Sequence, residues 1–276
     1  MIPKPAGLAA GARRRKTHAL NSGRGYNEPL TLSIVIPAYN EERRLPSTLD
    51  VILDWLDGGS YQDAELLIVD DGSTDATAAI VENRAASEPR LRLLRNPGNC
   101  GKGYAIRHGM LEAKGDWILS SDADLSAPID QLPKLLAAAE QRGAAIAIGS
   151  RALDRSLIGV RQSQSREMSG IVFNWVMRLT TGLSFADTQC GFKIFRRDAA
   201  CRVFKLQRLD GFSFDVEDLF IARTLGIPTI EVPVRWNNVE GTKVSLLHGI
   251  ASFFDLLRIR WNWLQGHYTD NSHGTD

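Results

Sequence analysis

Trp117-Ile118-Leu119-Ser120-Ser121-Asp122-Ala123-Asp124 is the stretch around which the rest of the chain is organised. Its apolar beginning is typical of a short buried strand, and two carboxylates one residue apart follow in the turn after it. Mg²⁺ and Mn²⁺ prefer such hard oxygen ligands, and they take one or two protein carboxylates while a substrate's phosphates complete the shell. The alternative is an ordinary polar turn, because Asp and Ser are common where strands end.

The composition fits a folded α/β protein. The chain has 276 residues, of which 43% are hydrophobic, enough for one large domain or two small ones. The formal net charge is +1, so no overall field indicates nucleic acid as a partner. Three cysteines without paired ligand spacing argue against a disulfide framework and a zinc site. The sequence contains no run of about 18 apolar residues, so no transmembrane helix is predicted and a soluble or peripheral protein is expected.

The two ends of the chain are predicted to be disordered tails, over residues 1–29 and 267–276. The first tail is basic and has little apolar periodicity. Its role is either that of a solvated leader or a weak attraction to an anionic membrane surface. Its charged residues are Lys4, Arg13, Arg14, Arg15, Lys16 and Arg24 against Glu28 alone.

Strand-like and helix-like segments alternate through the first half of the chain. Such alternation predicts crossover connections and a mostly parallel sheet, which binds ligands beyond the carboxyl ends of its strands. The polar loops lie at those ends, so we expect them to converge on one crevice. The predicted strands are 32–36, 65–69, 91–94, 117–119 and 145–149, and the predicted helices are about 45–56, 75–86, 104–114 and 130–142.

The second half is less regular. A helix is expected from about 168 to 181, a short strand at 194–195, and a further helix opened by residues 212–218. Residues 229–236 read as an edge strand, because Pro233 cannot donate to an interior ladder. A long aromatic-rich helix is predicted from 246 to 264. Without an internal repeat or a long linker, a single domain over 30–245 with a C-terminal amphipathic helix over 246–266 is the predicted organisation.

Three motifs occur in order, each after a predicted strand: Ser33-Ile34-Val35-Ile36-Pro37-Ala38-Tyr39-Asn40-Glu41-Glu42, Val69-Asp70-Asp71-Gly72-Ser73-Thr74-Asp75 and Asp122-Ala123-Asp124. At these spacings the chain resembles GT-A glycosyltransferases of the inverting family 2 over residues 30 to 245. Within that family it looks most like polyprenyl-phosphate sugar transferases, and it resembles dolichyl-phosphate β-glucosyltransferases more than mannose synthases. The segments that carry this closer likeness are Gly101-Lys102-Gly103, Asp122-Ala123-Asp124-Leu125-Ser126 and Asp187-Thr188-Gln189-Cys190-Gly191-Phe192-Lys193.

The resemblance implies a donor site at the ends of the first strands. Pro37, Tyr39 and Glu41 would hold the nucleoside, with Tyr39 as a stacking face and Glu41 as an acceptor for ribose hydroxyls. Asp71 would receive the imino hydrogen of the base or the ribose, and Lys102 belongs to the same donor-binding set. Glu41 could instead compensate the dipole of the helix that follows it.

The acidic pair would hold the metal ion, Mg²⁺ or Mn²⁺. Asp124 is the expected direct ligand, and Asp122 would bridge the ribose or the sugar and assist the metal. The cation would offset charge that develops on the departing nucleoside diphosphate. Mannose synthases of this family usually carry Gln two residues after the second Asp. Ser126 stands at that place, so a third protein ligand is left open.

The acceptor decides the remaining chemistry. A polyprenyl phosphate is already an anion at neutral pH because the second pKa of a phosphate is about 6, so no strong base is needed. Cations must then hold that phosphate in line with the anomeric carbon. The resemblance assigns this task to Arg151 and Arg166, although a surface salt bridge is the ordinary role of a lone arginine. A sugar hydroxyl as acceptor would instead require a carboxylate base, for which Asp215, Glu217 and Asp218 stand in the corresponding region; Asp215 could also orient the sugar.

Two further segments complete the predicted site. Gln189 is expected to contact donor hydroxyls, and Lys243 in the lid-like loop 237–243 to reach the diphosphate when the lid closes. The C-terminal helix has an apolar face with Trp261 and Trp263. It either packs on the sheet or lies at a lipid interface, and helix 171–179 is a second candidate surface.

The sequence thus predicts a metal-dependent inverting transferase that moves glucose from UDP-glucose to a polyprenyl phosphate, peripheral at the cytoplasmic face of a membrane. One alternative is a GDP-mannose-dependent polyprenyl-phosphate mannosyltransferase, and another is a family 2 enzyme with a soluble hydroxyl acceptor. A non-catalytic nucleotide-sugar binding protein fits less well, because the acidic motifs are intact. The pattern leaves the oligomeric state open and gives no indication of nucleic acid as a partner.

Overall fold

The computed structural model describes residues 31–59, 61, 63–160, 164–239 and 246–269, excluding the side chains of 164–167, 169 and 246–251. The two predicted terminal tails and the lid residues 240–243 therefore lie almost wholly outside the described residues. Within the described part, no helix is long and apolar enough to cross a bilayer.

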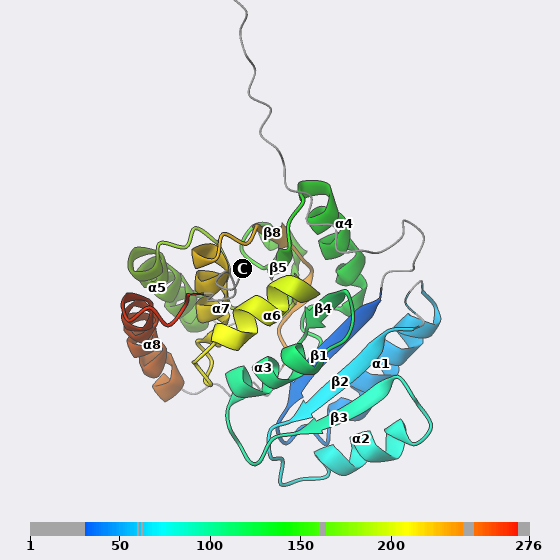
Figure 1. The fold of residues 1–276 in the computed structure, drawn as a ribbon. Helices are drawn as coiled ribbons and strands as arrows, with labels where there is room; N and C mark the ends of the chain where they lie inside the picture. The colour runs from blue at the N-terminus through cyan, green and yellow to red at the C-terminus, as the bar shows by residue number, and fades with distance from the viewer. Residues whose placement is uncertain (1–30, 60, 62, 161–163, 240–245, 270–276) are drawn as a thin grey trace, which may run out of the picture.

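The centre of the molecule is a seven-stranded sheet in the order β3-β2-β1-β4-β7-β5-β8 among the described residues (Figure 1). Neighbouring strands are parallel except at β7, which runs antiparallel to both β4 and β5. The predicted mostly parallel sheet and the edge position of β8 are confirmed. The strand bounds are β1 Leu32–Ala38, β2 Glu65–Asp70, β3 Leu91–Arg95, β4 Trp117–Ser120, β5 Ile146–Ser150, β7 Lys193–Arg196 and β8 Thr229–Pro233.

Two apolar cores cover the two faces of this sheet. Along β1, Ile34 and Ile36 belong to one core and Val35 to the other, as the alternation of a strand requires. The first core packs against α1 (Leu45–Asp57) and α4 (Leu132–Arg142), and the second against α3 (Lys102–Glu112), α6 (Arg197–Leu206) and α7 (Phe214–Thr224). Because both faces are covered, the central strands read as continuous apolar runs.

The remaining elements lie around this layer. They are α2 (Thr77–Ala85), the 3₁₀ turns η1 (Ile129–Gln131) and η2 (Arg155–Leu157), a small parallel pair β6 (Ile158–Val160) and β9 (Trp236–Asn237), and the helices α5 (Gln164–Thr181) and α8 (Leu246–Leu264). Helices α5 and α8 pack side by side at the far end of the molecule from β3 (Figure 1).

Several boundaries differ from the prediction. Strand β1 continues through Pro37, which pairs with Val69, instead of ending at Ile36. The helix expected over 130–142 is divided into η1 and α4, with Pro133 in the first turn of α4, where a missing N–H is tolerated. The predicted edge strand ends at Pro233, and Trp236 belongs to β9.

Candidate active site

The loops after β1 and β2 are joined by hydrogen bonds, which fix the segment predicted to hold a nucleoside. Asn40 has a left-handed φ of 52°, its N–H donates to Ser73 Oγ at 2.9 Å, and its Oδ1 accepts from the Thr74 N–H at 2.8 Å. The Glu41 N–H donates to Thr77 Oγ1 at 2.7 Å. Two strand-end loops that are distant in sequence therefore form one rigid rim.

Tyr39 and Glu41 lie on this rim, Pro37 lies near the end of β1, and all three residues are partly exposed. The Glu41 carboxylate forms an ion pair with Arg44 at 3.3 Å, at the start of the chain that leads into α1. This contact is a further local role of Glu41; the first turn of α1 contains no acidic residue, so Glu41 does not lie in the turn where a carboxylate compensates the helix dipole best. The nucleoside-binding roles of the three residues stay predictions.

Asp71 has a structural task that the sequence reasoning missed. Its Oδ1 accepts from Asn96 Nδ2 at 2.7 Å and from the Cys100 N–H at 3.0 Å, and its Oδ2 accepts from the Gly101 N–H at 2.8 Å. The carboxylate, only 4% exposed, thereby holds the glycine-rich loop against the end of β2. Gly101 has a φ of 104°, a conformation that favours glycine, so this loop leads directly into α3 and places Lys102.

Lys102 and Asp122 meet at the end of β4. Lys102 Nζ lies 2.6 Å from Asp122 Oδ1, and both side chains remain partly exposed. Burial alone would raise the pKa of Asp122, but the charges of Lys102, Lys193 and Arg151 hold that pKa below its usual value. Burial would likewise lower the pKa of Lys102, but Asp122, Asp215 and Asp124 raise it. Asp122 is thus an anion and Lys102 a cation at neutral pH.

The turn that carries Asp124 is tight. Leu125 has a left-handed φ of 47°, and the Ser126 N–H donates to Asp124 Oδ1 at 2.9 Å. The Ala123 carbonyl accepts from Thr48 Oγ1 at 2.6 Å, which anchors the turn to α1. These contacts fix Asp124 in the turn beyond the end of β4.

Ser126 occupies a different environment from the two carboxylates. It is buried, and its backbone carbonyl accepts from the Asn237 N–H at 2.8 Å. In the described part of the chain, no group of three or more His, Cys, Asp or Glu residues could hold a metal ion by itself. The metal-binding roles of Asp122, Asp124 and Ser126 stay predictions.

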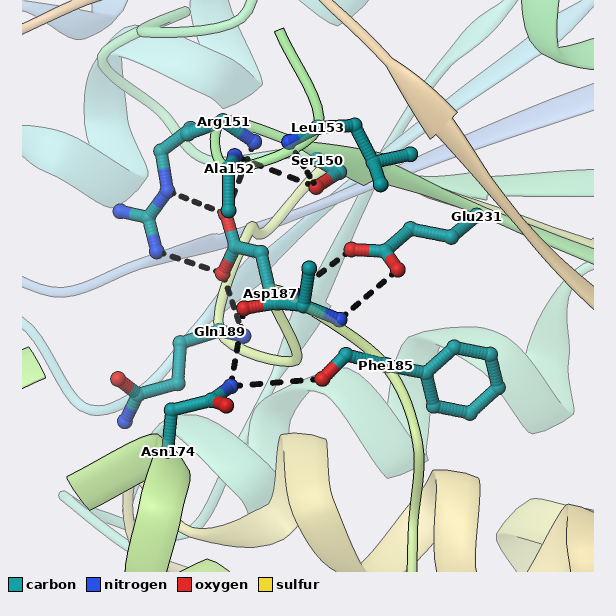
Figure 2. A network of polar contacts seen from close by, with 10 residues as sticks. Ser150, Arg151, Ala152, Leu153, Asn174, Phe185, Asp187, Gln189 and Glu231 are labelled. Atoms are coloured by element: carbon teal, nitrogen blue, oxygen red, sulfur yellow. Dashed lines mark hydrogen bonds and ion pairs between the residues drawn. The ribbon is translucent and has the colours of Figure 1, made fainter. Parts of the chain in front are cut away.

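Arg151 follows β5 and forms an ion pair with Asp187 (Figure 2). Its Nε lies 2.6 Å from Asp187 Oδ2 and its Nη2 lies 2.8 Å from Oδ1, so the ion pair is bidentate. Asp187 is fixed in turn because Glu231 accepts from the backbone N–H groups of Ala186 at 2.9 Å and Asp187 at 2.8 Å. No sequence pattern predicts this pair, since its partners lie 36 residues apart.

The other predicted contacts are distributed around this network. Gln189 is exposed, its N–H donates to Asp187 Oδ1 at 3.1 Å, and its side chain extends away from the ion pair (Figure 2). Arg166 lies in α5, but its side chain is outside the described residues, as is Lys243. Their predicted phosphate contacts are therefore not tested by the structure.

The three carboxylates at the start of α7 have separate environments. Asp215 is buried and forms an ion pair with Lys193; burial raises its pKa although Lys193 and Lys102 oppose this. Glu217 accepts from the Arg208 and Leu209 N–H groups at 2.9 Å and 2.7 Å. Asp218 is buried, and its Oδ1 has no hydrogen-bond partner among the described residues. Of these three carboxylates, Asp215 is the one whose charge interacts with both Lys102 and Asp122.

Comparison with known proteins gives a consistent pattern. A sequence profile described as glycosyl transferase family 2 matches residues 33–204. The dolichyl-phosphate beta-glucosyltransferase of Drosophila melanogaster is 38% identical over 248 residues, which cover 86% of this chain and 72% of the relative. The protein of that name from Homo sapiens is 36% identical over 248 residues, covering 85% and 76%.

A solved structure shares the fold at lower sequence identity. Glucosyl-3-phosphoglycerate synthase from Mycobacterium tuberculosis, in complex with Mn²⁺, uridine-diphosphate and phosphoglyceric acid, superposes with a TM-score of 0.60 and 19% identity. The match covers 89% of this chain and 81% of that structure. At this identity the likeness concerns the architecture alone.

Proposed function

Because this chain belongs to glycosyl transferase family 2, we propose that it transfers glucose from UDP-glucose to a polyprenyl phosphate of the dolichyl type. The protein is a glycosyltransferase with a GT-A fold, as the motif resemblance predicted. Relatives named for glucose transfer to dolichyl phosphate, at 36% and 38% identity over most of the chain, support the choice of sugar and acceptor.

The observation that carries the proposal is the ion pair of Lys102 with Asp122 at the end of β4, in the turn that also carries Asp124. Asp124 and Asp122 would hold Mg²⁺ or Mn²⁺, which supplies positive charge for the departing nucleoside diphosphate. Lys102, whose raised pKa keeps it cationic, contributes a second positive charge in the same place. In this proposal Tyr39 and Glu41 hold the nucleoside, and Asp71 holds the loop that carries Lys102 against the end of β2.

Arg151 receives the acceptor phosphate in this proposal. Asp187 accepts from Nε and Nη2 of Arg151, and we propose that Nη1 donates to the acceptor phosphate. A phosphate oxygen of the lipid attacks the anomeric carbon while the bond from that carbon to the UDP oxygen breaks. The products are a glucosyl phosphate lipid with inverted configuration and UDP, and no proton needs to be removed from the acceptor.

The burial of Asp215 favours this acceptor over a sugar hydroxyl. A hydroxyl acceptor needs a carboxylate base within hydrogen-bond reach of solvent-accessible substrate. Asp215 is 5% exposed and paired with the buried Lys193. We assign it the role of holding Lys193 and, through it, the sugar side of the pocket. The lipid acceptor places the reaction at a membrane, and we propose the cytoplasmic face, where nucleotide sugars are the donors.

The test is transfer of labelled sugar from a panel of UDP- and GDP-sugars to a short polyprenyl phosphate, with and without Mn²⁺. We expect a glycolipid from UDP-glucose only when the metal is present. Asp124→Ala should lower transfer and Mn²⁺-dependent UDP binding by at least about 100-fold, while Asp54→Ala on the exposed side of α1 serves as the matched control. No glycolipid from any donor would refute the acceptor, and an Asp124→Ala rate within about threefold of the parent would refute the metal-binding role.

A further inference from the structure

Helices α5 and α8 share an exposed apolar surface, which we call the α5/α8 face. Each of its side chains is at least 49% exposed. The residues recur at helical spacing and form one stripe on each helix. The members are Met168, Ile171, Val172, Trp175 and Leu179 of α5 and Phe254, Leu257, Trp261 and Leu264 of α8. Elsewhere in the described chain the large exposed apolar residues are mostly isolated, which is ordinary for a surface.

The two helices are well packed on their inner sides. Phe173 and Met177 of α5 and Leu256 and Ile259 of α8 are buried in the second core. The rings of Phe173 and Phe253 meet edge to face, with centroids 5.6 Å apart. Because the inner side chains pack α5 and α8 against each other, one pair of joined helices carries both exposed stripes. Nine large exposed apolar side chains on one pair of packed helices indicate an interaction site.

The charges beside the face indicate the partner. Among the described side chains of the two helices, Arg178, Arg258 and Arg260 stand against Asp255 alone. The Arg260 guanidinium lies 4.7 Å from the centre of the Trp263 ring. Tryptophan and arginine next to an apolar stripe are the residues that favour the boundary between headgroups and acyl chains. Basic side chains at that depth are attracted to anionic lipids.

We propose that the α5/α8 face lies on an anionic lipid bilayer, with its apolar side chains inserted at the headgroup boundary. The helices lie parallel to the surface and do not cross it, consistent with their amphipathic pattern. This inference rests on the proposed function and extends it. An enzyme bound to the bilayer and a lipid acceptor in that bilayer diffuse along the same surface, so they encounter each other more often.

Helix α5 is hydrogen-bonded to the loop that leads to Asp187, the partner of Arg151. Asn174 on the inner side of α5 donates from Nδ2 to the Ala186 carbonyl at 2.9 Å, and Arg178 Nη2 donates to the Phe185 carbonyl at 2.9 Å (Figure 2 shows Asn174). Asp187, which follows Ala186, forms the ion pair with Arg151. A bilayer that positions α5 therefore also positions the loop proposed to receive the lipid phosphate.

The experiment measures co-sedimentation of the full chain with phosphatidylcholine vesicles that contain or lack phosphatidylglycerol. The parent should bind the anionic vesicles more tightly, and added salt should weaken this binding. The double variant Trp175→Glu, Trp261→Glu should bind at least about tenfold more weakly, because it places two charges in the apolar stripe. Leu111→Glu, a comparable change on the exposed side of α3, should bind as the parent does.

A second variant and a second readout separate docking from folding and from catalysis. Arg258→Glu leaves the apolar stripe intact and should weaken binding to anionic vesicles selectively. The double variant should keep the parent's rate with a short acceptor in free solution and lose at least about tenfold with a long-chain acceptor embedded in vesicles. If the parent transfers no sugar even to the short acceptor, the proposed function fails while the vesicle result stands.

Three outcomes would overturn the proposal. The parent could bind neither vesicle composition, or the double variant could bind as tightly as the parent. The parent could also sediment as a dimer that the double variant dissociates, which would make the α5/α8 face an interface between two copies of the chain.

Discussion

Gly191 offers a way to displace the Asp122 carboxylate without changing its chemistry. A Cβ atom at Gly191 would lie 2.3 Å from Asp122 Oδ2, 2.5 Å from Cγ and 2.6 Å from Oδ1, whereas ordinary contacts begin at 3.4 Å. In Gly191→Ala, either the carboxylate or the loop must therefore move by about 1 Å. The same movement would disturb the 2.6 Å ion pair between Asp122 and Lys102.

A displacement of about 1 Å at a reacting centre costs on the order of 100-fold in rate. We therefore expect kcat for sugar transfer in Gly191→Ala to fall by about 100-fold, with little change in melting temperature because the site is at the edge of the core. Initial rates with UDP-glucose and thermal melts measure the two effects. Gly211→Ala is the control, since a Cβ there meets no atom within 4 Å. A folded Gly191→Ala variant with a rate within about threefold of the parent would show that the position of Asp122 does not matter for catalysis.

Three further substitutions test the buried polar groups. Burial and then Glu217 raise the pKa of Asp218 well above its usual value, so the folded state loses stability as pH rises from the unfolded pKa of about 3.9 through the folded one. Asp218→Asn should thus melt higher than the parent at about pH 8 and alike at about pH 4; an equal difference at both would contradict this. Tyr268→Phe removes the 2.5 Å hydrogen bond to buried Glu217 and should lower the free energy of unfolding, measured in urea, by about 1–3 kcal/mol; an unchanged value would disprove that role. Asp71→Asn turns a donor toward the Gly101 N–H, so affinity for UDP should fall at least about tenfold by calorimetry, and parental affinity would refute the loop-holding role.

The layered fold was predictable because its signals are local. The apolar runs at 32–36 and 65–69 lie buried on both faces of the sheet, and their polar loops meet at one edge as parallel strands require. The place of β7 was not predictable, since a short strand does not encode which neighbours it will separate. Helix α6 follows β7 directly and was also missed, because no turn residue divides them.

The site was predictable to the level of its motifs and not of its contacts. The acidic pair and the donor loops are short segments that each follow a strand. The pairing of Arg151 with Asp187 and the contact of Gly191 with Asp122 join residues far apart in the chain, so only the folded geometry reveals them. The same holds for Lys193 and Asp215, which are charged in sequence and buried together in the structure.

The most direct test of the central claim is the structure of the product. The parent enzyme, given UDP-glucose, a short polyprenyl phosphate and Mn²⁺, should form a lipid-linked glucosyl phosphate whose anomeric proton coupling in NMR reports the β configuration. Formation of the α anomer, or of glucose and UDP without any glycolipid, would contradict direct attack by the lipid phosphate that Arg151 is proposed to hold.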